Sequence, residues 1–254
     1  MNFLKKAFFG AAAALTLAGS AIAGPVNVGG VMWDPDSLVD FKGTSATIIQ
    51  NIAADGSLSG FGVITTLNNT GVGVFCPGCE LTFQFGGYTP VSAQGIPTTG
   101  DPAGTAINYT GGWLKIYVDH TPDADPADPT TLTAANAADG VLWLDLAGHL
   151  TNGVSLIGTN NFNTDNAALA GSGKFDVVGG LAALNFSTHT QPDGADLTFT
   201  STFTDFPVVV GGVPVTSTGA ATFKGNSIPE PGSMALVGLG LLAAGAMRRR
   251  QASK

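Results

Sequence analysis

The chain is poor in charged residues, and the few that it has are unevenly distributed. Charged residues make up 11% of its 254 residues, against about 25% in an ordinary soluble protein. No acidic residue precedes Asp34 or follows Glu230, and all three arginines lie at positions 248–250. Between positions 24 and 228, seventeen acidic residues face four lysines, a net charge of −13. The phosphate backbone of a nucleic acid repels a segment with this negative charge, so nucleic-acid partners are disfavoured.

Sequence motifs of the common enzyme classes are missing as well. The sequence holds no G-x-S-x-G elbow, no P-loop, no dinucleotide fingerprint and no H-E-x-x-H pair. Its three histidines, His120, His149 and His189, are far apart in the chain. Paired carboxylates could hydrolyse glycosides, but no pair stands out among the scattered acids. We therefore expect a protein that is not an enzyme and has no resident cofactor.

The N-terminus has the three parts of a secretory signal peptide. Lys5 and Lys6 supply the positive start, and an apolar run follows from position 7 to 18. Ala21 and Ala23 then form an A-x-A cleavage site, so that Gly24 begins the mature protein after signal peptidase has acted. A retained anchor helix is the alternative, but the run is short for a bilayer about 30 Å thick. The pattern predicts export through residues 1–23.

The C-terminus also has three parts in a fixed order. Pro229, Glu230 and Pro231 come first, an apolar segment predicted as a helix over 233–247 follows, and a basic cluster closes the chain. At about 1.5 Å per residue this helix is short for a span, yet it can extend back to the proline, and arginine stems reach the headgroups. The cluster consists of Arg248, Arg249 and Arg250.

This order resembles the PEP-CTERM sorting signal. The resemblance implies that exosortase, a membrane peptidase with a cysteine nucleophile of its own, cuts near residues 229–231. It also implies transient anchoring in the inner membrane of a Gram-negative bacterium, followed by transfer to the cell surface or the exopolysaccharide matrix. The alternative is an ordinary membrane anchor, for which arginines on the cytoplasmic side are equally suitable.

The middle of the chain alternates between apolar and polar residues as β-strands do. Leu81, Phe83 and Phe85 alternate with polar neighbours. No long helical stripe interrupts the strands, so we predict an all-β single domain over 24–225, an antiparallel β-sandwich or jelly roll, with a linker at 226–228. The expected strands cover 44–52, 58–68, 81–85, 113–120, 141–150, 173–178, 197–203 and 213–224.

The only two cysteines, Cys76 and Cys79, enclose a Pro-Gly pair. Proline and glycine suit the centre of a type II turn, which brings the outer two Cα atoms within about 7 Å. In an oxidising compartment this spacing predicts a disulfide at a hairpin tip. A redox role would need the first cysteine at the start of a helix, and a zinc site would need a second ligand pair.

An acidic run follows the strand predicted at 113–120. Its aspartates are weak candidates for calcium, which takes six to eight oxygen ligands. The spacing lacks the glycine and glutamate of an EF-hand, and a solvated surface loop has the same composition. The candidate ligands are Asp119, Asp123, Asp125 and Asp128.

Several segments of the body together are similar to the flocculation-associated PEP-CTERM protein family. That resemblance implies a secreted protein that helps cells and exopolysaccharide to aggregate, and it supplies no catalytic residues. Two alternatives stay open: a lectin-like carbohydrate-binding module, with Trp113 or Trp143 as stacking residues, and a secreted hydrolase. The segments are WDP from Trp33, DF at 40–41, FCPGCELTFQFGGY at 75–88, VDHTP at 118–122, DGVLWLDLAGH at 139–149 and GADLTF at 194–199.

Overall fold

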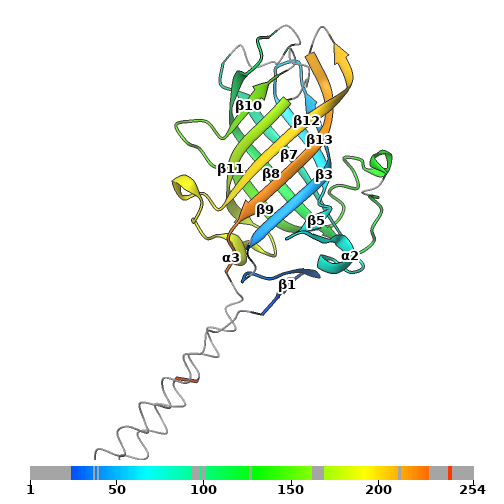
Figure 1. Ribbon diagram of the computed structural model, residues 1–254, viewed down its shortest axis with the longest axis vertical. Coiled ribbons are helices and arrows are strands. Elements are labelled where there is room, and N and C mark those ends of the chain that lie inside the picture. The colour runs from blue at the N-terminus through cyan, green and yellow to red at the C-terminus, as the bar shows by residue number, and fades with distance from the viewer. Residues whose placement is uncertain are drawn as a thin grey trace, which may run out of the picture.

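The computed structural model describes the body of the chain and little of its ends. It covers residues 24–36, 38, 40–92, 98, 101–125, 128–161, 169–210, 213–228 and 240–241. The signal residues Ala21 and Ala23, the Pro229–Pro231 motif and the terminal arginines lie outside this part. So does most of the hydrophobic helix predicted over 233–247. The described body is built almost entirely of antiparallel strands (Figure 1).

The main sheet is a closed barrel of eight strand positions in which each strand pairs with the next along the chain. The ring closes because the last strand, β13, pairs with the first, β3, along a register running from Thr216 opposite Asn51 to Gly225 opposite Phe41. In chain order the long strands are β3 (Phe41–Ile52), β4 (Leu58–Val63), β7 (Glu80–Pro90), β8 (Thr105–Asp119), β9 (Val141–Gly148), β10 (Leu156–Asn160), β11 (Leu169–Gly179), β12 (Leu197–Val210) and β13 (Val213–Gly225).

Two segments, β9 and β10, share one position in the ring. Strand β10 pairs with the first part of β8, where Leu156 lies opposite Tyr109, and β9 pairs with its last part, where Ala147 lies opposite Trp113. Both segments also pair with β11 on their other side. The short loop between them therefore interrupts one wall strand without opening the barrel.

Phenylalanines fill the interior, and glycines on the neighbouring strand make room for them. A side chain at Gly60 would lie 2.4 Å from the Phe85 ring, and one at Gly62 would lie 2.3 Å from the Phe83 ring. Eight strands enclose a space that side chains can fill. An apolar cavity of about 40 Å³ remains among side chains that include Phe85, Tyr109 and Phe199.

Short elements close the lower end, which we call the base; the chain enters and leaves the barrel there (Figure 1). A hairpin of β1 (Val26–Val28) and β2 (Val31–Trp33) crosses this end. Other small elements are β5 (Thr66–Leu67), β6 (Thr70–Gly71), α2 (Val72–Phe75), α3 (Ala183–Phe186) and the 3-10 turns Pro129–Thr131 and Pro192–Gly194.

The loop between β8 and β9 folds back onto the outside of the barrel. Its Ala124, Leu132 and Ala137 form a second apolar cluster with Val63 of β4. The Gln84 side chain of β7 donates a hydrogen bond to the Ala134 carbonyl. The acidic run expected to be a solvated loop is therefore partly packed against the wall.

The predicted all-β, antiparallel class is confirmed, but the predicted sandwich or jelly roll is corrected to a closed barrel. Each of the eight predicted segments contains a wall strand or part of one. A sandwich of two sheets would leave unpaired edges, whereas pairing of β13 with β3 removes them. Strand β10 and the β1–β2 hairpin were missed because they are short.

Candidate functional site

Four aromatic rings fill the base of the barrel. Trp33 of β2 stacks on Phe186 of α3 with 5.2 Å between ring centroids and meets Trp143 of β9 edge-on at 5.7 Å. Phe41, the first residue of β3, packs against Phe186 at 4.6 Å. The Trp143 indole Nε1 donates a hydrogen bond of 2.9 Å to the Val28 carbonyl. These contacts hold the N-terminal hairpin against the barrel.

The same end binds the segment that leads out of β13. The Ser227 backbone N–H donates to Asp40 Oδ2 at 2.7 Å, and its hydroxyl donates to Asp40 Oδ1 at 2.6 Å. That hydroxyl also accepts a hydrogen bond of 2.9 Å from Trp33 Nε1. One serine thus joins the C-terminal segment to residues almost two hundred positions earlier.

The next residue is bound through its backbone. The Ile228 N–H donates to the Asn185 carbonyl at 2.8 Å, and the Asn185 side-chain amide donates to the Ile228 carbonyl at 3.1 Å. Asn226 adds a 2.9 Å hydrogen bond to Thr190 Oγ1. The segment 226–228, predicted as a linker, is therefore attached to the body. We call Trp33, Asp40 and Asn185, with Ser227 and Ile228, the base clamp.

Cys76 and Cys79 form a disulfide with their Cα atoms 5.1 Å apart. The turn has the predicted geometry: Gly78 has φ of +78°, and the Cys79 N–H donates to the Cys76 carbonyl at 3.1 Å. Its location differs from the prediction. Phe75, expected to be in a strand, ends the one-turn helix α2, so the disulfide joins that helix to β7 rather than capping a hairpin.

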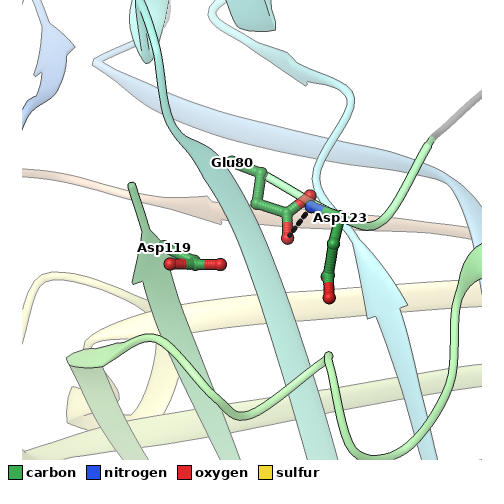
Figure 2. A group of neighbouring side chains, drawn as sticks. All are labelled: Glu80, Asp119 and Asp123. Carbon is green, nitrogen blue, oxygen red and sulfur yellow. Dashed lines mark hydrogen bonds between the residues drawn. The ribbon is translucent and has the colours of Figure 1, made fainter. Parts of the chain in front are cut away.

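Glu80, Asp119 and Asp123 form the one group of potential metal ligands among the described residues. Their carboxylate oxygens lie within 4.8 Å of one another. Figure 2 shows them converging from β7, from the end of β8 and from the loop after β8. Glu80 was not predicted as a ligand, because it occupies a polar position in an alternating strand.

Glu80 is the most deeply buried member of this acidic group. Burial raises the pKa of Glu80, and the nearby charges of Asp123 and Asp119 raise it further. Its carboxylate accepts backbone hydrogen bonds from Asp123 at 3.3 Å and Ala124 at 3.0 Å. A carboxylate in this position can take up a proton or bind a cation.

The other two predicted calcium ligands lie elsewhere in the loop. The Asp125 backbone N–H donates to the Thr131 hydroxyl at 2.8 Å. Asp128 is bonded within its own turn, where its carboxylate accepts hydrogen bonds from the Thr130 N–H and hydroxyl. The structure therefore brings together Asp119 and Asp123 of the predicted four and adds Glu80.

The three histidines do not meet in one place. His149 Nδ1 lies 2.7 Å from Asp176 Oδ1, and His189 Nδ1 lies 3.5 Å from the buried Asp196. His120 follows β8 and contacts the β1–β2 turn near Gly30.

The two tryptophans proposed for sugar stacking have different surroundings. Trp143 is fully buried in the base, whereas Trp113 is 37% exposed on the outer wall. The Trp113 ring lies over Gly86 and Gly87, where an added Cβ would come within about 3 Å of it. The Lys115 ammonium is 5.8 Å from the ring centroid. Trp113 is therefore the one of the two that can meet a ligand.

The PEP-CTERM protein-sorting motif matches the chain at residues 227–250. The match begins at Ser227, the residue bound by Asp40 and Trp33. No curated protein and no solved structure matches the chain. Among the residues that the structure describes, no helix has both the length and the apolar character needed to cross a bilayer. The sorting motif identifies the chain as an exosortase target that is exported toward the surface of a Gram-negative bacterium.

Proposed function

We propose that this chain is a non-enzymatic protein of the cell surface and extracellular matrix that promotes aggregation of cells with exopolysaccharide. The observation that carries the proposal is the sorting motif at residues 227–250. The similarity of the body to flocculation-associated proteins supports the same role. The acidic charge of the body suits a protein that stays hydrated among polymers.

Processing would proceed in two stages. Signal peptidase and the export machinery would bring Gly24 and the body across the inner membrane. The apolar run, with Arg248–Arg250 on the cytoplasmic side, would then hold the chain in that membrane until exosortase cuts near Pro229–Pro231. The mass of the released protein, compared between cells with and without exosortase, tests this order and reveals any covalent adduct.

The outer wall is the part of the barrel on which a polysaccharide would bind. The cavity inside holds about 40 Å³, whereas pockets for small ligands usually measure about 300–1,000 Å³. A chain of sugars therefore has no room inside. Deletion of the gene should reduce flocculation, and complementation with the intact gene should restore it. Unchanged flocculation after deletion would refute the proposed role.

A lectin-like function is the second candidate, favoured by the exposed ring of Trp113. The ring is partly exposed on a glycine platform and can stack on a sugar. Lys115, whose ammonium lies over the ring, and Asp145, 3.9 Å from that ammonium, supply polar groups next to it. Trp113→Ala should reduce retention of the released protein on the polysaccharide of its own cells. Ile157→Ala, which removes another exposed apolar side chain, is the control. Equal retention of both variants and the wild type would exclude Trp113.

A secreted hydrolase is the remaining alternative and belongs to a different class. A screen of the released protein against glycosidic and ester substrates separates it from the other two. We expect no turnover. Turnover that is lost on substitution of a described carboxylate would replace the binding proposal with an enzymatic one.

A further inference from the structure

We infer that the base clamp sets the upstream limit of exosortase cleavage, so that Ser227 and Ile228 remain with the released body. The inference rests on processing by exosortase and adds to it the role of the folded barrel. Trp33, Asp40 and Asn185 act as positioning residues, since they bind the segment next to the sorting motif and take no part in peptide-bond cleavage.

The clamp occupies the backbone groups that a peptidase would need. The N–H groups of Ser227 and Ile228 and the carbonyl of Ile228 each have a partner in the body. Peptide recognition in an extended form uses these same main-chain groups. A peptidase can therefore bind the chain through Ser227 and Ile228 only after this segment detaches from the body.

The clamp can form only when the body is folded. Asp40 and Trp33 lie 187 and 194 positions before Ser227, and Asn185 lies 43 positions before Ile228. Trp33 reaches Ser227 from the hairpin that begins just after the predicted signal cleavage site. Folding of the barrel and docking of its N-terminal hairpin therefore precede protection of the segment.

The length of the connecting chain places this event close to the membrane. The apolar run begins at Met234, six residues after Ile228. Six residues span at most about 21 Å when fully extended. If the run is in the bilayer, the base lies within about this distance of it, and cleavage takes place in the narrow gap between the two.

The test is the C-terminal peptide of the released protein, read by mass spectrometry from cells that contain exosortase. The wild type should end at one position at or beyond Ile228. Ser227→Ala removes the hydroxyl that joins Asp40 to Trp33, and Asn185→Ala removes one bond to Ile228. Loss of each hydrogen bond should raise about tenfold the fraction of molecules in which the segment 226–228 is detached from the body. The double variant should therefore show additional ends before Ser227.

Controls separate positioning from general damage to the fold. Ser227→Thr keeps the hydroxyl, so the released protein should have the same single C-terminal end as the wild type. Asp205→Asn alters a carboxylate that contacts Thr218 on the barrel wall, and it should leave the end unchanged. Thermal unfolding of each released variant shows whether the barrel is intact.

Three results would overturn the inference. The first is a wild-type protein that ends before Ile228. The second is a folded double variant with the same single end as the wild type. The third is a wild type that exosortase does not cut at all, which would also remove the processing step on which the inference rests. The first two results would refute the clamp alone and leave sorting by exosortase intact.

Discussion

Replacement of the buried Trp143 tests whether the base is the structural centre that its contacts indicate. Trp143 has no exposed surface and packs against Trp33, Phe41 and Phe186. Truncation of a buried large aromatic side chain costs about 3–5 kcal/mol of unfolding free energy. Trp143→Ala also removes the hydrogen bond from the indole to the Val28 carbonyl, which adds about 1 kcal/mol. We expect a loss of about 4–6 kcal/mol.

The matched control is the same substitution on the barrel wall. Trp113 is 37% exposed and lies over two glycines, so Trp113→Ala should cost only about 1–2 kcal/mol. In a domain of this size, each kcal/mol shifts the midpoint of thermal unfolding by about 2–4 °C. Trp143→Ala should therefore lower the midpoint by about 10–20 °C.

The assay is urea and thermal unfolding of the released proteins, followed by far-ultraviolet circular dichroism, with each variant normalised to its own folded and unfolded baselines. Trp143→Phe is an intermediate variant that keeps a ring and loses the indole N–H, with an expected cost of about 1–3 kcal/mol. An equal loss for the Trp143→Ala and Trp113→Ala variants would refute the assignment of Trp143 to the core and Trp113 to the surface.

Three further predictions concern other parts of the barrel. The pKa of Glu80 is raised in the folded protein. Its contribution to stability is therefore present below its unfolded pKa of about 4.3 and is lost as pH rises through the folded pKa. Urea unfolding between pH 4 and 7 should show the wild type losing stability relative to the Glu80→Gln variant, and a difference between the two that does not change with pH would contradict the prediction. Calcium binding stays a prediction. Isothermal titration of the wild type at millimolar calcium should show heat of binding, which the Asp123→Asn variant should lose and the Asp128→Asn variant should keep. A wild type that gives no heat would exclude calcium binding. Gly62→Ala places a Cβ 2.3 Å from the Phe83 ring and should lower the free energy of unfolding in urea by about 1–3 kcal/mol. Gly73→Ala is the control and should be nearly neutral, because an added Cβ there has open space. Equal losses for the two variants would refute the packing argument.

The alternating pattern was enough to predict most of the long wall strands but not the closure of the sheet into a barrel. Leu81, Phe83 and Phe85 point into the barrel because strand residues alternate between two faces. A sandwich and a barrel have the same alternation, so the pattern could not distinguish them. The difference depends on pairing of β13 with β3 and on glycines such as Gly60 and Gly62, whose role is visible only beside the phenylalanines that they accommodate.

The candidate sites, too, were only partly predictable from the sequence. Asp119 and Asp123 could be selected from the acidic run, but Glu80 could not, because it reaches them from another strand. Asp40, Trp33 and Asn185 had no signal that linked them to Ser227, since ordinary polar and aromatic residues gain this role only through contact. Sequence spacing therefore identified the turn of Cys76 and Cys79, whereas contacts between distant segments could not be predicted.

The sequence by itself determined the sorting motif, the strand-rich class and the acidic character of the body. Each of these depends on residues that are close together in the chain or on composition, and the sorting motif is a linear segment whose order can be read directly. The tertiary structure decided how the sheet closes, which tryptophan is exposed, which carboxylates meet and where the sorting motif is attached. These properties depend on pairings between residues up to almost two hundred positions apart, and such pairings arise only when the whole barrel packs.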